Sequence, residues 1–225
     1  MRSSSVTLFT KNRARDIVLA LLLTLCIICF AVIVTVFFKQ LYYFDIDYLN
    51  IAKNTGLPKQ LIKENYDVLI QYQSIFFQGT LQLPDFVMST TGRIHFEEVK
   101  RIFDMIQILF VVSGGISLVM IYQNIKQKEY RFLRLTPMFS IGIPTVIGFL
   151  AALDFDQAFV IFHKIFFRND YWIFDYTTDP VITILPESFF MHCFMMIIVI
   201  VVVISLIMYL IYRKKRDLIL EEISE

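Results

Sequence analysis

The sequence lacks the motifs on which most soluble enzymes depend. It contains no G-x-S-x-G motif, which argues against a serine hydrolase. Its three cysteines, Cys26, Cys29 and Cys193, have neither the spacing of metal ligands nor that of a secreted disulfide framework, so we interpret them as small buried hydrophobic residues. No basic stripe or nucleic-acid-binding motif is present, which excludes nucleic acid as a partner.

Charge is also scarce. Only 18% of the 225 residues are charged, whereas 57% are hydrophobic, and a soluble domain of this size would expose too little polar surface with that composition. Four apolar segments of 19 residues or more predict transmembrane helices over residues 16–38, 105–123, 135–153 and 188–212. The first is too long for a signal-peptide core and has no A-x-A cleavage pattern, so we expect it to be retained. Pro137 and Pro144 predict a kink in the third.

The positions of lysine and arginine predict the orientation of these spans. Four basic residues lie in each of three stretches, the tail 1–15, the connector 124–134 and the tail 213–225. Four spans would put all three on one side, so both termini are predicted to be cytoplasmic. The longer connectors, 39–104 and 154–187, hold 14 of the 20 acids but only 9 of the 21 basic residues, and are predicted to lie outside.

The two outer connectors carry apolar residues at helical spacing. Residues 58–77 are predicted to form an amphipathic helix, and residues 95–100 the first turns of a helix that continues into the second span, after a polar turn at 89–92. In the second connector, a helix is expected to begin at Asp156 and end near Asn169. Asp179-Pro180 predicts a short helix over 181–185. The fold class is therefore an all-α integral membrane protein, with four transmembrane helices and a small, mainly helical extracytoplasmic cap.

Residues 154–190 concentrate polar and aromatic side chains that a simple connector does not need. They include His163, the only tryptophan, Trp172, and Phe159, Phe162 and Phe166 on the same helical face as His163. This combination predicts a polar site walled by aromatic rings at the edge of the bilayer.

His95 and His163, on different outer segments, are the candidates for proton transfer near neutral pH. The alternative is that each histidine caps a helix or satisfies a buried carbonyl. A relay from Asp170, Asp175 or Asp179 to His163 is equally open, since each aspartate also suits a turn or a cap. His192 is expected to pack against its neighbours. Two histidines without paired carboxylates or cysteines make a poor zinc site, and we expect no cofactor.

The motifs of the two outer segments resemble those of a known family, the lipoprotein intramolecular transacylases of Gram-positive bacteria. The resemblance extends from the first to the fourth span and does not include the charged tails. One departure is Tyr176, where many relatives have proline after the aspartate that matches Asp175. The matching residues are His95-Phe96-x-x-Val99-Lys100, Phe162-His163-x-Ile165-Phe166-Phe167-x-Asn169-Asp170-x-Trp172-x-x-Asp175, Thr178-Asp179 and Pro186-Glu187.

This resemblance implies a specific reaction. The family acts on a diacylglyceryl-modified bacterial lipoprotein and moves the acyl chain from the glyceryl sn-2 oxygen to the α-amino group of the N-terminal cysteine, which gives a lyso-form lipoprotein. Its two catalytic histidines match His95 and His163. The implied location is the bacterial cell membrane, with the site facing outward and in contact with membrane lipid. As substrate-binding or positioning residues we expect Phe162, Phe166, Asn169, Asp170, Trp172 and Asp175.

The residues themselves are consistent with that reaction. When the substrate supplies its own amine as nucleophile, the enzyme needs no serine or cysteine. A histidine base can take the proton of an α-ammonium group, which titrates near pH 8. Two alternatives stay open at this point: a non-enzymatic scaffold or chaperone that binds partners through the cap, and a hydrolase of lipid esters that would release free fatty acid.

Overall fold

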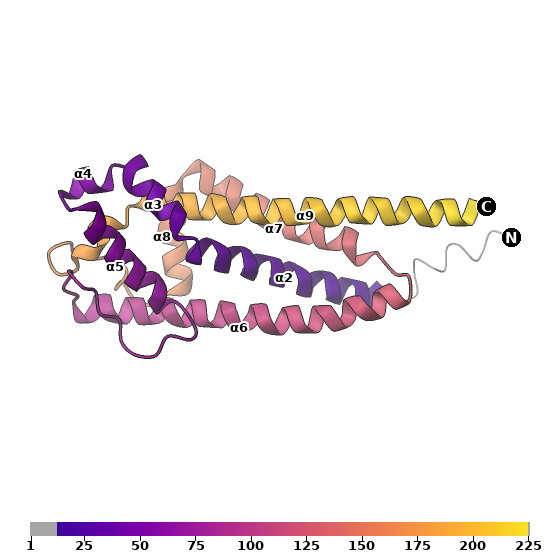
Figure 1. Ribbon diagram of the computed structural model, residues 1–225, viewed down its shortest axis with the longest axis horizontal. Helices are drawn as coiled ribbons and strands as arrows, with labels where there is room; N and C mark the ends of the chain where they lie inside the picture. The colour runs from indigo at the N-terminus through magenta and orange to yellow at the C-terminus, as the bar shows by residue number, and fades with distance from the viewer. Residues whose placement is uncertain (1–12, 225) are drawn as a thin grey trace. The chain divides into compact units, whose positions relative to one another are not determined.

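The computed structural model describes residues 13–224, and that part of the chain is helical without strands (Figure 1). The α-helices and the one 3-10 helix, η1, have the following bounds: α2 Arg13–Phe37, α3 Lys39–Tyr48, α4 Ile51–Thr55, α5 Lys59–Tyr72, α6 Thr90–Lys126, α7 Phe132–Leu153, α8 Phe155–Phe166, η1 Pro180–Ile184 and α9 Glu187–Ser224. Residues 1–12 of the predicted tail 1–15 lie outside the described residues.

Three of the described helices are long and apolar enough to cross a membrane: Arg13–Phe37, Thr90–Lys126 and the Glu187–Leu218 part of α9. They contain the predicted second and fourth spans and all of the predicted first span except Phe38. The predicted third span lies in α7, whose apolar stretch Phe132–Val146 is shorter. A fourth span therefore stays a prediction, as does the kink expected at the prolines inside α7.

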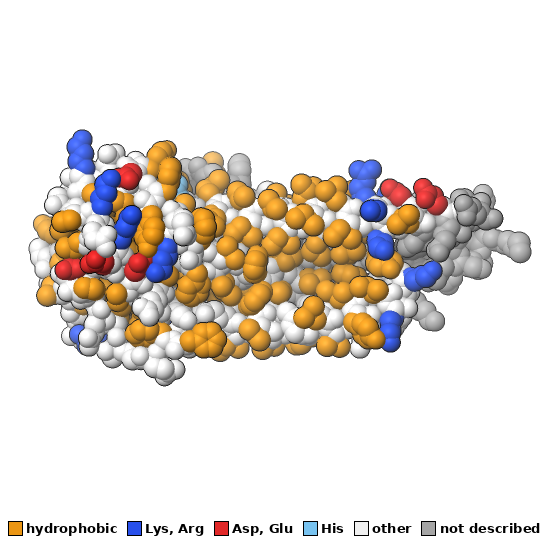
Figure 2. Space-filling model, viewed as in Figure 1, with side chains coloured by type: hydrophobic (Ala, Val, Ile, Leu, Met, Phe, Trp, Pro, Cys, Tyr) orange, Lys and Arg blue, Asp and Glu red, His pale blue; other side chains and the backbone are white. Residues whose placement is uncertain are grey.

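Charge divides α6 into two parts. Residues 90–104 include six charged side chains, whereas residues 105–123 include none, so only the latter part suits the hydrocarbon core. A helix of about 20 residues is enough to cross that core, and α6 has 37. His95 is therefore outside the apolar part of its helix. Figure 2 shows hydrophobic side chains over the apolar helices, with the charged side chains on other parts of the chain.

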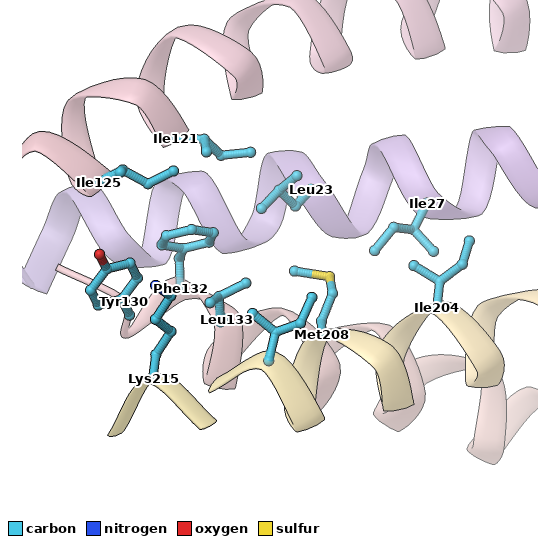
Figure 3. Close-up of a pocket in the computed structure, with 11 residues that line it drawn as sticks. Leu23, Ile27, Ile121, Ile125, Tyr130, Phe132, Leu133, Ile204, Met208 and Lys215 are labelled. Atoms are coloured by element: carbon cyan, nitrogen blue, oxygen red, sulfur yellow. The ribbon is translucent and has the colours of Figure 1, made fainter. Parts of the chain in front are cut away.

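The chain forms two compact units. Unit 2 comprises Val32–Gln107 and Phe149–Met196, and unit 1 comprises the rest of the described residues. In unit 1, Asn124 Nδ2 donates a buried hydrogen bond of 2.9 Å to Asp16 Oδ1. Unit 1 also contains an apolar pocket between α2, α6, α7 and α9 (Figure 3). Its lining is almost wholly aliphatic and aromatic, and it contains no histidine or acid, so it is not suited to proton transfer.

Unit 2 contains both predicted outer connectors, 39–104 and 154–187, and has more helices than the sequence predicts. The rings of Tyr42 and Tyr66 stack with centroids 3.7 Å apart, and Tyr42 Oη donates to the carbonyl oxygen of Ile184 at 2.6 Å. These contacts join α3, α5 and η1 around one hydrophobic core. The amphipathic helix predicted over 58–77 is present as α5. The sequence did not predict α3 and α4.

Several predicted helix ends are wrong, each for a local reason. Asp154, not Asp156, is the N-cap of α8, because its Oδ1 accepts from Gln157 N at 2.9 Å. The helix ends at Phe166, three residues early, because Phe167 has extended backbone angles. The predicted polar turn at 89–92 is mostly helix, since α6 begins at Thr90.

Asp179 does not cap the helix that follows it, although η1 does begin at Pro180 as expected. Its Oδ1 accepts from the backbone N–H of Ser89 at 2.8 Å, and its Oδ2 accepts from Thr178 Oγ1 at 2.8 Å. Gly92 packs directly on this carboxylate, where a β-carbon would collide with Asp179 Oδ1. Asp179 thus fastens the start of α6 to the segment before η1.

Candidate active site

His163 is buried on α8, with 8% of its surface exposed. Its Nδ1 lies 2.7 Å from the carbonyl oxygen of Phe159, one turn earlier in the same helix. A carbonyl oxygen only accepts, so Nδ1 must be the protonated nitrogen that donates. In the neutral ring, Nε2 therefore keeps a free lone pair, and it is the atom that can accept a proton from a substrate.

Aromatic rings enclose His163. The indole of Trp172 stacks on it with centroids 4.6 Å apart and planes 27° apart, and Phe159 lies at 4.1 Å. Phe162 meets it edge-on at 5.4 Å, and Phe167 lies at 5.6 Å. The polar and aromatic crowding of residues 154–190 thus has a structural basis, because much of it forms one cluster of rings around this imidazole, the histidine pocket.

His95 reaches the same pocket from α6, although 68 positions in the sequence separate it from His163. The two imidazole centroids are 6.1 Å apart. His95 is 6% exposed and is flanked by Phe167 at 4.7 Å and Phe174 at 5.4 Å. Its Nδ1 is buried and has no hydrogen-bond partner within the described part of the chain. The structure therefore brings the two predicted histidines together.

Burial determines the charge of both rings, because the charged form is poorly solvated among apolar side chains. Burial lowers the pKa of His95 to about 4, and the neighbouring His163 contributes to that shift. Burial also lowers the pKa of His163, although its bond to the Phe159 carbonyl partly opposes the shift. Both rings are accordingly neutral at pH 7, which suits one as a proton acceptor and the other as a hydrogen-bond donor.

The other predicted site residues differ in how close they lie to the two imidazoles. Phe162 contacts His163 and Phe166 packs on Phe162 at 4.7 Å, and each phenylalanine is 49% exposed. Asn169 Nδ2 donates to Glu98 Oε1 at 2.9 Å. Asn169 therefore links the segment after α8 to α6.

Asp170 and Asp175 bond within their own turns. The carbonyl oxygen of Asp170 accepts from Ile173 N at 3.0 Å. Asp175 Oδ1 accepts from both N and Oγ1 of Thr177, and these two bonds lower the pKa of its carboxyl group. With Asp179 bonded to Ser89, none of the three aspartates forms a hydrogen bond to His163 among the described residues, so the relay that the sequence left open is not supported.

Sequence reasoning missed three residues of this pocket. Phe167 and Phe174 line it, and Glu98 borders it through Asn169. The spacing of Glu98 from His95, one helical turn, was the available signal. Among the described residues, no group of three or more histidine, cysteine, aspartate or glutamate side chains is arranged to hold a metal ion.

His192 also differs from expectation, because it makes a specific bond and does not only pack. Its Nδ1 lies 2.9 Å from both Oδ1 and Oδ2 of Asp45, a fully buried carboxylate on α3. This pair belongs to unit 2, where the ring of Tyr48 lies 5.7 Å from that of His192. Because the bond joins α3 to α9, we assign the pair to the fold and not to the chemistry.

Comparison with known proteins gives one consistent result. The family model for the lipoprotein intramolecular transacylase Lit matches residues 17–190. A solved structure of the membrane-integral transacylase of this name from Bacillus cereus is 39% identical, with a TM-score of 0.90 over 92% of this chain and 96% of that chain. Another, with one histidine replaced by arginine, is 37% identical, with a TM-score of 0.85 over 96% and 95%. Comparison with curated proteins gives no match.

Proposed function

The chain belongs to the family of lipoprotein intramolecular transacylases, and on that premise we propose that His95 and His163 are its catalytic pair. The protein is a membrane transferase that acts on lipoproteins. In the proposed reaction, the sn-2 acyl chain of a diacylglyceryl-modified lipoprotein moves to the α-amino group of its N-terminal cysteine. The observation that carries this proposal is the pair of neutral imidazoles, 6.1 Å apart in a buried aromatic pocket.

His163 acts as the base in this proposal. The N-terminal ammonium loses one proton to solvent, and the resulting amine attacks the carbonyl carbon of the sn-2 ester. His163 Nε2 takes the second proton from the attacking nitrogen, because Nδ1 is committed to the Phe159 carbonyl. When the bond between the carbonyl carbon and the glyceryl oxygen breaks, the imidazolium returns that proton to the oxygen. The products are an amide and a free sn-2 hydroxyl group.

His95 acts as the hydrogen-bond donor to the tetrahedral oxyanion. Its low pKa makes it a poor imidazolium acid, but a neutral imidazole N–H can still stabilise negative charge in a site that excludes water. The sequence left the two roles of the histidines open. The fixed tautomer of His163 and the deeper burial of His95 support this division between them.

The pocket also reduces the entropic cost of folding the substrate back on itself. Amine and ester belong to one flexible lipid, and holding them at reaction distance can contribute several orders of magnitude to the rate. Phe159, Phe167 and Trp172 supply the walls. An exposed apolar face of α8 suits membrane lipid and the acyl chain, as in helices that lie in a membrane interface. That face consists of Ile161, Phe162, Ile165 and Phe166.

The orientation is part of the same proposal. With four spans, of which the third lies in α7, both termini would be cytoplasmic and unit 2 would face outward. This orientation would place the two histidines on the outer side of the membrane.

The test is the N-terminus of a reporter lipoprotein co-produced with the protein, measured by mass spectrometry. The intact protein converts the diacylglyceryl form to the lyso form without a change of mass, and fragmentation locates the acyl chain on nitrogen. His95→Ala and His163→Ala should each lower this conversion by a factor of at least about 100 at an unchanged membrane level of protein. Normal conversion by both variants contradicts the catalytic assignment, and free fatty acid would indicate hydrolysis.

A further inference from the structure

Glu98 has an unsatisfied carboxylate oxygen at the edge of the histidine pocket. Its Oε1 accepts from Asn169 Nδ2 at 2.9 Å. Its Oε2 is buried and has no hydrogen-bond partner within the described part of the chain. A buried carboxylate oxygen without a donor is costly, and native proteins contain few of them. This oxygen is therefore available to accept from a donor on a bound ligand.

The position of Glu98 indicates where such a ligand would bind. Glu98 follows His95 by three residues on α6, so their β-carbons lie about 5–6 Å apart on one helix face. Its partner Asn169 comes two residues after Phe167, whose ring contacts both imidazoles. The nearest basic side chain in sequence, Lys100, is engaged elsewhere, with Asp104 Oδ1 and the Ser74 carbonyl oxygen each at 3.0 Å. The protein thus holds a carboxyl group on the same face of α6 as His95.

We propose that Glu98 Oε2 binds the α-ammonium group of the substrate's N-terminal cysteine and so selects lipoproteins whose amino terminus is free. This inference rests on the proposed transacylase function. An ammonium group offers three donors and a positive charge, which a half-paired carboxylate accepts in a charge-assisted bond. An N-acylated terminus has one neutral N–H, and it would leave Glu98 buried without its counter-charge.

The same contact favours release of the product. Transfer of the acyl chain converts the ammonium into an amide, which removes the charge that Glu98 recognises. Glu98 therefore binds the amino terminus of the substrate more tightly than the acylated terminus of the product. Glu98 contributes to affinity and specificity, while His163 performs the proton transfer.

The test compares two synthetic diacylglyceryl lipopeptides that differ only in N-acetylation of the cysteine. Binding is measured in detergent at pH 7 with the His163→Ala protein, so that no turnover interferes. This protein should prefer the free-amine lipopeptide. Adding Glu98→Gln, which keeps the Asn169 bond and the side-chain shape, should weaken binding of the free-amine lipopeptide by roughly 10- to 100-fold and leave the N-acetyl lipopeptide unchanged.

Two controls separate recognition from structural damage. Glu97→Gln removes the adjacent carboxylate, which lies near Tyr72 and does not share the Asn169 bond of Glu98, and should retain the preference. Raising the pH well above about 8 should progressively remove the preference in the protein that has Glu98, because the ammonium group loses its proton.

An unchanged preference in Glu98→Gln, or an equal loss of affinity for both lipopeptides, overturns the inference. The proposed function is tested separately. If the protein with both histidines makes no lyso-form lipoprotein, the function fails whatever Glu98 binds. If it makes that product but Glu98→Gln binds both lipopeptides as before, only the role of Glu98 fails.

Discussion

A histidine base usually depends on a carboxylate or another side chain to select its tautomer. In this protein, the carbonyl oxygen of Phe159 does so for His163, from one turn earlier in the same helix. The tautomer is thus set as soon as α8 forms, before substrate arrives. The three aspartates of the same segment are consequently free for turns and for packing.

The pH dependence of turnover follows from the burial of His163. Its pKa is lowered from the ordinary 6.5, so the ring keeps its accepting form down to more acidic pH than a solvent-exposed histidine would. We expect kcat to fall about tenfold per pH unit below about 8, because the substrate's ammonium group must lose a proton, and to fall more steeply only below a second midpoint under 6.5, as His163 gains a proton. The pH profile of kcat with saturating lipopeptide measures this second midpoint. A second midpoint at or above 6.5 would contradict the assignment of His163 as the buried base.

The sequence predicted the site at the level of residue types better than at the level of contacts. Both histidines and Trp172 were identifiable because polar side chains next to a bilayer are energetically costly and usually have a function. A binding role for Asp170 and Asp175 stays a prediction, since a short turn directs its side chains in ways that spacing does not specify. Glu98 was overlooked because an acid near a helix start already has an ordinary explanation in the helix dipole.

At the scale of elements, the close packing of Gly92 on Asp179 joins the start of α6 to residues 174–179. This segment includes Phe174, whose ring lies beside His95. Gly92→Ala should displace Asp179 and separate Phe174 from His95, because the carboxylate is held by Ser89 and Thr178 and cannot move away. We expect at least about a 10-fold loss of transacylation and a lower midpoint of thermal unfolding.

Gly115→Ala on the same helix is the matched control. A β-carbon added at this position would have no atom within 4 Å, and alanine favours a helix over glycine by about 1 kcal/mol. That variant should retain activity and stability. If Gly92→Ala behaves in the same way, the packing of α6 on Asp179 has no role in forming the site.

The pair of Asp45 and His192 connects α3 to α9 within unit 2. His192→Ala leaves the buried Asp45 carboxylate without its donor, which we expect to cost about 1–3 kcal/mol of unfolding free energy. For a chain of this size, that corresponds to a decrease of roughly 2–12 °C in the unfolding midpoint, measurable in detergent. His192→Asn, which keeps a donor near the position of Nδ1, should lose less. Equal losses in both variants would argue against the hydrogen bond as the cause.

Element types were more predictable than element ends. The helical spacing in 58–77 and 155–166 identified α5 and α8 correctly. The ends depended on which of several capping residues the tertiary structure used, as with Asp154 in place of Asp156. The short α3 and α4 were missed because few of their side chains are buried, so their sequences carry little apolar periodicity.

For the whole molecule, the distribution of charge predicts sidedness. With the native cysteines replaced, Tyr176→Cys in the cap and Gln127→Cys in the connector after α6 provide two exposed reporters. In intact protoplasts, a membrane-impermeant maleimide should label only the cysteine introduced in the cap, and the one in the connector should react after permeabilisation. Labelling of both positions in intact protoplasts would contradict four spans with cytoplasmic termini.

The class of fold was predictable because apolar segments of about 20 residues without charge are typical of transmembrane helices and rare in soluble proteins. Family membership was also predictable, since two short outer stretches hold most of the resemblance. What the sequence could not provide was the way in which α6, α8 and residues 167–174 converge. That arrangement depends on contacts such as Ser89 to Asp179 and Asn169 to Glu98, which join residues 90 and 71 positions apart.

The apolar outer face of α8 has a practical consequence for enzymology. Phe162 contacts His163 and is half exposed. A detergent or lipid molecule that packs on Phe162 is therefore separated from His163 only by the phenylalanine ring. Detergents with long alkyl tails would compete with the substrate's own chain there. Reaction rates should consequently vary with tail length and micelle concentration, and bilayer nanodiscs would give the more faithful kinetics.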